Sequence, residues 1–202
     1  MTSMNSEYEL KHWRAKWQKN FSRAKIMEEM FPYPMDAKIV ADIGCGPLCG
    51  IFGEAQFPSM YAVDPLWDEY FREQLYYLYA SVTPMCAAAD SFKLPEPADL
   101  IFSFNALDHS GTLKENIQNV MNNLAEDGVF CFHIHLRSKD QLNAGHKMVV
   151  TEEELDEIFD PYKMYYGRIV KRDPFLPRKS KKKYRAYMVM VSNQRKENGY
   201  AQ

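Results

Sequence analysis

From residue 39 onward, short apolar runs alternate with longer segments in which apolar residues recur every three or four positions. The short runs have the length of buried strands, and the longer segments have the period of helices that bury one face. Residues 151–154, Thr-Glu-Glu-Glu, have the form of a capping box that opens a helix. The expected strands cover residues 39–41, 59–64, 85–89, 99–104, 129–136, 163–170 and 184–192. The expected helices between them cover residues 48–55, 66–79, 112–124 and 151–159.

Strand–helix alternation through the first five expected strands predicts an α/β fold, a doubly wound and mostly parallel sheet with helices on both faces. No helix is expected between the last two strands, and strands joined without a crossover run antiparallel. We therefore expect an antiparallel strand at one edge of the sheet. A chain of 202 residues is large enough for a single domain with a real core, and we see no domain boundary within residues 1–202.

The first 35 residues are expected to form a helical cap, ahead of an α/β core over residues 36–202. Between Glu7 and Met30, apolar residues recur every three or four positions and share one helix face. This stripe either packs on the domain or brings Trp13 or Trp17 over the substrate as part of a lid. The stripe consists of Leu10, Trp13, Trp17 and Phe21.

Composition narrows the classes of protein to consider. Apolar residues make up 46% of the chain and charged residues 26%, which is the composition of a folded domain. The net charge of −2 disfavours nucleic-acid binding through global electrostatics. No apolar run is long enough to cross a membrane, and the N-terminus lacks the apolar core of a signal peptide. The four cysteines form no CxxC pair and are typical of free thiols in a reducing compartment, so we expect a cytoplasmic protein.

The candidate chemistry begins where the first expected strand ends, in the turn Asp42-Ile-Gly-Cys-Gly46. A strand that leads into a glycine-rich turn and a helix forms a cradle for a nucleotide, because Gly44 and Gly46 allow a tight turn and the close approach of a ligand. Asp42 would repel a phosphate, but not a ligand with a hydroxylated ribose and a positive charge. The chain also lacks a Tyr-x-x-x-Lys pair, so a nicotinamide-dependent oxidoreductase is disfavoured.

Two more acids follow the next two expected strands, Asp64 and Asp90. Ligands of open parallel sheets bind beyond the carboxyl ends of the strands. Asp64 lies 20 residues after Gly44, about the spacing at which an acid meets the two hydroxyls of a ribose, and a carboxylate can accept from both. Asp90, Ser91 and Phe92 would then lie beside adenine, with a carboxylate accepting from its exocyclic amine. Three strand-end acids after a glycine turn predict a cofactor site.

These motifs resemble class I S-adenosylmethionine-dependent methyltransferases over residues 38–136, about half of the chain. The resemblance rests on the glycine turn, Asp64-Pro65, Ala89-Asp90 and Asn105-Ala-Leu-Asp-His109, and the last of these is similar to the small-molecule branch of the ubiquinone-biosynthesis type. It implies a Rossmann-like, seven-stranded sheet with the last strand antiparallel. One departure is Leu48, which stands where the family often has a third glycine. The implied S-adenosylmethionine site consists of Asp42, Gly44, Cys45, Gly46, Asp64, Pro65, Asp90, Ser91, Phe92 and Asn105.

Methyl transfer is an in-line displacement in which the alignment of acceptor, methyl and sulfur matters most, and a base is needed only if the acceptor loses a proton. Asp108 and His109 follow the fourth expected strand, where the resemblance places the methyl group and the acceptor. His109 either takes a hydroxyl proton near neutral pH, or caps the next helix, or bounds the pocket. His135 is a further candidate to reach the substrate. His133 and His135 also form an HxH pair, but no third ligand is evident from spacing, so no metal is expected.

The leading hypothesis is an enzyme that transfers a methyl group from S-adenosylmethionine to a small molecule, at oxygen. One alternative is an RNA or protein methyltransferase guided by the basic run Arg178–Lys183, which otherwise is a solvated hairpin loop. Another is a binding protein of the same fold without chemistry. The segment after Asn105 lacks the Asn/Asp-Pro-Pro-aromatic loop associated with methylation of DNA amino groups, so that activity is disfavoured.

Overall fold

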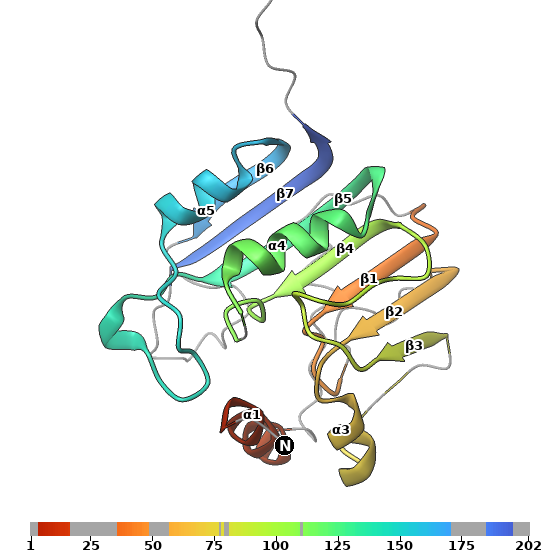
Figure 1. Cartoon of the computed structure of the whole chain (residues 1–202), viewed down its shortest axis with the longest axis vertical. Coiled ribbons are helices and arrows are strands. Elements are labelled where there is room, and N and C mark those ends of the chain that lie inside the picture. The colour runs from red at the N-terminus through yellow and green to blue at the C-terminus, as the bar shows by residue number, and fades with distance from the viewer. Residues whose placement is uncertain are drawn as a thin grey trace, which may run out of the picture.

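The computed structural model describes residues 4–16, 36–48, 57–76, 78, 81–109, 111–170 and 185–195. Its centre is a seven-stranded sheet in the order β3-β2-β1-β4-β5-β7-β6 (Figure 1). The strands are β1 (Ile39–Ile43), β2 (Ser59–Val63), β3 (Val82–Met85), β4 (Ala98–Phe104), β5 (Leu124–His135), β6 (Tyr162–Val170) and β7 (Ala186–Arg195).

Strands β1 to β5 run parallel, whereas β7 is antiparallel to both of its neighbours, β5 and β6. The predicted α/β sheet, seven-stranded and mostly parallel with an antiparallel last strand, is therefore confirmed. The expectation that this strand lies at an edge is wrong, because β7 lies between β5 and β6. Residues 186–192 are all buried, as in a strand covered on both faces, whereas Lys163, Met164 and Tyr165 of β6 are exposed and suit an edge.

One predicted strand is displaced along the chain, and one predicted helix is shorter than expected. β3 ends at Met85, where the expected strand began, because the chain leaves the sheet there and turns across its end. Helix α3 (Trp67–Glu73) is shorter than the expected 66–79, because Gln74 adopts a left-handed conformation, φ 56°, and caps the helix. The expected helix over residues 48–55 lies almost wholly outside the described residues, as do Trp17, Phe21 and the basic run at 178–183.

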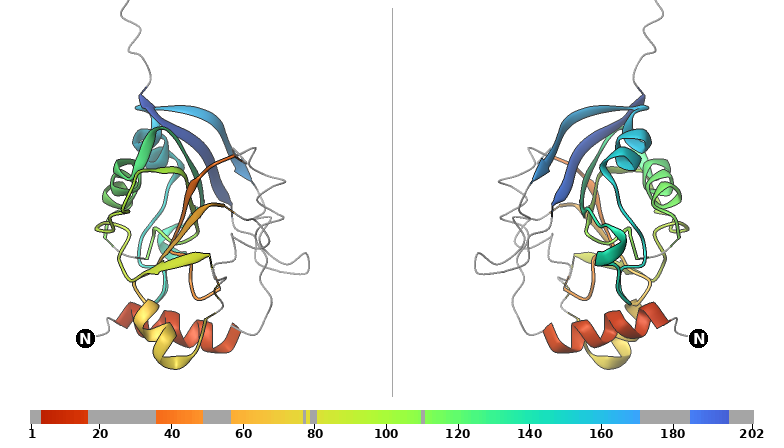
Figure 2. Two further views of the ribbon diagram at one scale, coloured as in Figure 1. Left: turned by 90° about the vertical axis from the view of Figure 1, so that its right-hand side faces the viewer. Right: turned by 90° about the vertical axis from the view of Figure 1, so that its left-hand side faces the viewer.

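Helices α4 (Leu113–Asn122) and α5 (Glu152–Phe159) cover the same face of the sheet (Figures 1 and 2). The side chains of Thr112 and Thr151 each accept a hydrogen bond of 3.2 Å from the backbone N–H three residues on, which satisfies a donor that the helix leaves unpaired. The core under these helices includes Ile117, Val120, Phe130, Phe132 and Phe159. The core on the opposite face includes Val40, Leu100, Phe102, Cys131 and Met188, so the side chains of β5 alternate between the two cores.

Helix α1 (Met4–Lys16) lies across the end of the sheet toward which β1, β2 and β4 point (Figures 1 and 2). Leu10 is its buried apolar residue in the described part of the chain, so α1 adds little to either core. Parallel α/β sheets bind ligands at this end. Among the described residues, no helix has the length and apolar character needed to span a membrane.

Candidate active site

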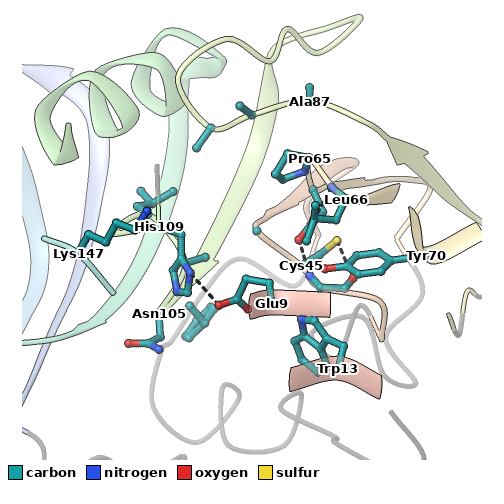
Figure 3. A pocket seen from close by; sticks show the side chains of 18 residues that line it. Glu9, Trp13, Cys45, Pro65, Leu66, Tyr70, Ala87, Asn105, His109 and Lys147 are labelled. Atoms are coloured by element: carbon teal, nitrogen blue, oxygen red, sulfur yellow. Dashed lines mark hydrogen bonds and ion pairs between the residues drawn. The ribbon is translucent and has the colours of Figure 1, made fainter. Parts of the chain in front are cut away.

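A cavity of about 430 Å³ lies between α1 and the carboxyl ends of β1 to β4 (Figure 3). Its wall comes from segments far apart in the sequence, which the parallel sheet brings to one edge. The described residues that line it are Glu9, Trp13, Gly44, Cys45, Gly46, Asp64, Pro65, Leu66, Tyr70, Ala87, Ala88, Ala89, Phe104, Asn105, Ala106, Leu107, His109 and Lys147.

The glycine turn after β1 exposes backbone, without side chains, to the cavity. Gly44 and Gly46 both have positive φ, 70° and 64°. A Cβ at Gly44 would lie 2.2 Å from Cβ of Ala106, and a Cβ at Gly46 would lie 2.6 Å from Cζ2 of Trp13. Conformation and space both exclude a side chain at these two positions. The turn therefore has the form of the expected nucleotide cradle, with Trp13 lying on it from α1.

Asp64 closes the β2 side of the cavity. It is 6% exposed, and its Oδ2 and Oδ1 accept hydrogen bonds of 2.9 Å from the backbone N–H groups of Gly46 and Leu66. Tyr70 also hydrogen-bonds this carboxylate, so accepting from two ligand hydroxyls would use the remaining lone pair and the one that Tyr70 engages here. Burial raises the pKa of Asp64 to about 6, although the two backbone hydrogen bonds favour the ionised form. The carboxylate therefore fits a pair of ligand hydroxyls, as a ribose presents.

Four residues predicted to contact the cofactor lie outside this wall. Asp42 is buried in β1, Phe92 is part of the core, and Asp90 and Ser91 are exposed. The N–H groups of Ser91 and Phe92 donate to the carbonyl of Ala88 at 3.2 and 3.0 Å, so their turn fixes the alanine segment that does line the cavity. The predicted cofactor residues that the structure brings together in the wall are Gly44, Cys45, Gly46, Asp64, Pro65 and Asn105.

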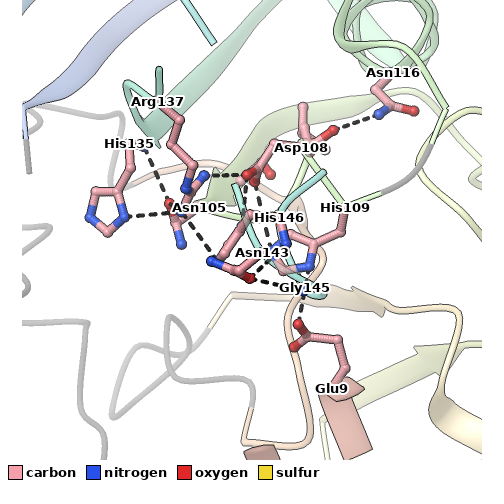
Figure 4. A network of polar contacts seen from close by, with 12 residues as sticks. Glu9, Asn105, Asp108, His109, Asn116, His135, Arg137, Asn143, Gly145 and His146 are labelled. Carbon is pink, nitrogen blue, oxygen red and sulfur yellow. Dashed lines mark hydrogen bonds and ion pairs between the residues drawn. The ribbon is translucent and has the colours of Figure 1, made fainter. Parts of the chain in front are cut away.

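Asp108 lies behind the wall on the opposite side, in a buried network centred on Arg137 (Figure 4). Its Oδ2 accepts from the Arg137 guanidinium and lies 2.8 Å from Nδ1 of His146. Burial alone would raise the pKa of Asp108, but His146, His109 and Arg137 outweigh it and hold this pKa below its ordinary value. Asp108 is therefore ionised and charge-compensated.

Arg137 also joins the end of β5 to the segment after β4. Its Nη2 lies 3.4 Å from Oδ1 of Asn105, 3.4 Å from Nδ1 of His135 and 3.2 Å from Nε2 of His146. The backbone N–H of His135 donates to the same Asn105 oxygen at 3.2 Å. His135 and Asp108, two of the three predicted catalytic residues, thus lie behind the cavity wall and help to hold Asn105, which lines the cavity.

His109 is the predicted catalytic residue that lines the cavity. Its Nδ1 lies 3.2 Å from Oε1 of Glu9 on α1, and its Nε2 lies 3.7 Å from Oδ1 of Asp108. Burial alone would lower the pKa of His109, but the hydrogen bond to Glu9 and the charges of Asp108 and Glu9 outweigh it and raise this pKa above its ordinary value. The imidazole is therefore bracketed by two carboxylates.

Asp108, His109 and His146 also bring potential metal-ligand atoms within 4.8 Å of one another. Arg137 lies against this cluster, paired with Asp108 and 3.2 Å from Nε2 of His146. A fixed guanidinium charge at that distance opposes the binding of a cation. We therefore interpret the cluster as an ion-paired network that supports the wall.

Besides the pair between Glu9 and His109, three further contacts hold helix α1 over the cavity. Arg14 forms a two-pronged ion pair with Glu73 of α3, in which Nε donates to Oε2 at 2.6 Å. Trp13 lies on Gly46, and Tyr8 lies where a Cβ on Gly145 would approach its ring within 2.5 Å. Trp13 thus lines the cavity and also packs against the core, and both interpretations of the apolar stripe place it there.

The residues of the site that sequence reasoning missed include Glu9, Arg137, His146 and Lys147. Glu9 lies on the polar part of an amphipathic pattern, where an acid usually means only solvent exposure. One sequence signal could have indicated Arg137, because it lies two residues beyond a long apolar strand and so near the ligand-binding end of the sheet. In the structure Arg137 is buried. His146 and Lys147 lie in a segment without a motif, and only the fold brings them to the cavity.

No protein-family profile matches the chain, and no curated protein matches it by sequence. Solved structures do match. The N-methyltransferase NodS of Bradyrhizobium japonicum, in complex with S-adenosyl-L-homocysteine, aligns with a TM-score of 0.62 over 92% of this chain and 98% of its own, at 12% identity. An S-adenosylmethionine-dependent methyltransferase from Clostridium acetobutylicum aligns with a TM-score of 0.55 over 93% and 96% of the two chains, at 17% identity. YcgJ of Bacillus subtilis aligns with a TM-score of 0.57 over 84% and 97%, at 14% identity.

Likeness at such low identity shows the fold. The chain has the fold of S-adenosylmethionine-dependent methyltransferases. In this chain β7 lies antiparallel beside β5. The resemblance expected from the sequence is confirmed at this level.

Proposed function

We propose that the protein is an enzyme that transfers a methyl group from S-adenosylmethionine to a small molecule, at oxygen. The observation that carries the proposal is the meeting of three features in one cavity wall: the glycine turn, the buried carboxylate of Asp64 and the Asn105–His109 segment. The glycine turn admits a ligand to the backbone, and Asp64 can accept from two hydroxyls. This donor and acceptor set fits the ribose and the amino-acid part of the cofactor.

The cofactor, when bound, supplies a methyl group on a positively charged sulfur. Asp64 places negative charge in the wall, which favours a cationic ligand, whereas the charge of Glu9 is paired with His109. Pro65, Leu66 and the alanines at 87–89 form an apolar wall suited to an adenine ring. Cys45 and Asn105 would complete the contacts. Asp42, Asp90, Ser91 and Phe92 would act through the backbone that they support.

The acceptor side of the cavity is assigned to Asn105, His109 and Lys147, with Asp108 and His135 holding this side from behind. Helix α1 borders the cavity through Glu9 and Trp13, which helps to position ligands for a reaction that depends on alignment. A cavity of about 430 Å³ has the size of small-molecule sites, which favours a small acceptor over a segment of a macromolecule.

Isothermal titration with S-adenosyl-L-homocysteine tests the proposal. We expect binding by the natural sequence, and a loss of affinity of about tenfold or more in Asp64→Ala, because one carboxylate serves two hydroxyls. Asp68→Ala is the control, since Asp68 is an exposed acid on α3 that does not line the cavity. Tight binding of NAD, with no response to S-adenosylmethionine or S-adenosyl-L-homocysteine, would overturn it.

A further inference from the structure

Glu9 is the acid of α1 that reaches into the cavity. Its side chain is 20% exposed, and its Oε1 lies 3.2 Å from Nδ1 of His109. Both residues line the same cavity wall, so a ligand beside His109 also meets Glu9 (Figure 3). Burial alone would raise the pKa of Glu9, but the hydrogen bond and charge of His109 outweigh it and lower this pKa. The carboxylate is therefore ionised near neutral pH and accepts hydrogen bonds without donating any.

His109 itself is poorly suited to take up a further proton. One of its nitrogens faces Glu9 and the other faces Asp108, and carboxylates offer lone pairs only. A neutral imidazole would have to turn one lone pair toward a carboxylate, whereas the imidazolium donates toward both. The groups around the Glu9–His109 pair are His12 on α1, Asp108 after β4, and Arg137, His146 and Lys147 after β5.

Asp108 is not available for proton transfer either. Its Oδ2 is engaged by Arg137 and His146, and its Oδ1 is buried behind His109 (Figure 4). Of the two carboxylates found beside His109 in the described part of the chain, Glu9 lines the cavity and Asp108 does not. The carboxylate lone pairs that an acceptor molecule can reach beside His109 are therefore those of Glu9.

We propose that Glu9 is a catalytic residue whose carboxylate, held against His109, receives the proton of the acceptor hydroxyl while the hydroxyl oxygen is methylated. This inference rests on the proposed function. The hydroxyl oxygen supplies an electron pair to form the new C–O bond, and the pair of the breaking S–C bond remains on sulfur, which becomes a neutral thioether. The O–H proton passes to Glu9 and then to solvent, so atoms and charges balance.

The acidity of the acceptor explains why a carboxylate is a sufficient base. A hydroxyl becomes strongly acidic as its oxygen bonds to the methyl group, so a weakly basic carboxylate can accept its proton late in the reaction. An ammonium acceptor must instead lose its proton before it can attack, and a carboxylate with a lowered pKa is a poor base for that step. The arrangement thus selects hydroxyl acceptors over amines.

The first test is a histidine titration followed by NMR in the protein alone, so it depends on neither cofactor nor acceptor. The signal of His109 is identified by its absence in His109→Gln. In Glu9→Gln, which keeps the shape and removes the charge, we expect the pKa of His109 to fall by about one unit. Glu7→Gln on the same helix, exposed and outside the cavity, should leave it unchanged. An unchanged pKa in Glu9→Gln would overturn the pairing on which the proposal stands.

The second test measures methyl transfer to a panel of phenols and to benzylamines of similar size, which are ammonium ions at neutral pH, by mass spectrometry. We expect phenols to be methylated in preference to benzylamines, and kcat to fall about 100-fold or more in Glu9→Gln, which is typical of a lost general base. The KM for the phenol and the affinity for S-adenosyl-L-homocysteine should change little, and Glu9→Asp should restore part of kcat. Unchanged kcat in Glu9→Gln, or preference for benzylamines, would overturn the proposal.

The outcomes separate this inference from the proposed function. A large loss of S-adenosyl-L-homocysteine affinity in Glu9→Gln would overturn the catalytic role, because it would place Glu9 on the cofactor. Absence of S-adenosyl-L-homocysteine binding by the natural sequence would overturn the proposed function and the proton-transfer step together. The histidine titration would still decide whether Glu9 controls His109.

Discussion

The backbone N–H of Gly46 donates a hydrogen bond of 2.9 Å to Oδ2 of Asp64, which joins the glycine turn after β1 to the end of β2. The same carboxylate is the group assigned to the ligand hydroxyls, and burial raises its pKa to about 6. Because the ionised form is the one that accepts from two hydroxyls, binding should weaken as pH falls through this pKa. We expect the affinity for S-adenosyl-L-homocysteine to drop about tenfold between about pH 7.5 and about pH 5, measured by isothermal titration.

Asp64→Asn is the control for this pH dependence. It should bind more weakly at neutral pH, and its affinity should be nearly flat over the same range, because an amide does not titrate there. An equal fall in both proteins would assign the titration to another group and contradict the prediction.

Gly44→Ala should destabilise the protein by about 2–5 kcal/mol, measured by urea unfolding. A left-handed conformation costs a residue with a Cβ roughly 1–2 kcal/mol, and overpacking adds about 1–3 kcal/mol. The new Cβ would lie 2.2 Å from that of Ala106, which is on the segment after β4.

Gly111→Ala provides the matched control. Gly111 also has a positive φ, 61°, but the nearest atom to a Cβ there is an Asp90 carboxylate oxygen at 3.3 Å. Gly111→Ala should lower the free energy of unfolding only by the cost of the left-handed conformation, roughly 1–2 kcal/mol. Equal losses in the two variants would show that the contact with Ala106 relaxes without cost.

The parts of the fold that followed from the sequence are those fixed by local chemistry. Two glycines with positive φ and an acid at the end of β2 are specified by the residues themselves, and the structure places Gly44, Gly46 and Asp64 in one wall. The position of β7 was misjudged because strand order depends on which strand can be covered on both faces. To predict this order, the mostly apolar residues 186–192 must be compared with β6, in which residues 163–165 are exposed. The more apolar of the two strands then takes the inner position.

The residues on the acceptor side of the cavity could not be predicted in the same way, because the residues that contact one another there are distant in sequence. Glu9 and His109 lie 100 positions apart, and Asp108 and His146 lie 38 apart. Nothing local marks Glu9 as different from the exposed Glu7 two positions earlier. The difference arises only when α1 is laid across the end of the sheet, so sequence reasoning found His109 and missed the carboxylate beside it.

Arg137→Met should destabilise the protein by roughly 3–5 kcal/mol in urea unfolding, because it leaves the buried Asp108 carboxylate without its cation. Asp108→Asn added to this variant should recover part of the loss, since it removes the uncompensated charge. The exposed pair between Arg185 and Glu152, 2.8 Å apart, is the comparison, and Arg185→Met should cost about 0–1 kcal/mol. A similar small cost for Arg137→Met would mean that water or a histidine replaces the guanidinium.

Arg14→Ala should loosen α1 without unfolding the sheet. The helix places Leu10 in the core and Trp13 against it, and the exposed bidentate pair with Glu73 adds a modest further contribution to its attachment, so local opening requires little free energy. We expect the amides of residues 7–16 to exchange with deuterium several-fold faster, while those of β1 and β4 keep their rates.

Lys11→Ala is the matched control, because it removes an exposed positive charge from the same helix and should leave exchange unchanged. Glu73→Ala should reproduce the effect of Arg14→Ala from the other side of the pair. Equal exchange in Arg14→Ala and Lys11→Ala would show that Trp13 and Tyr8, rather than the ion pair, hold α1 over the cavity.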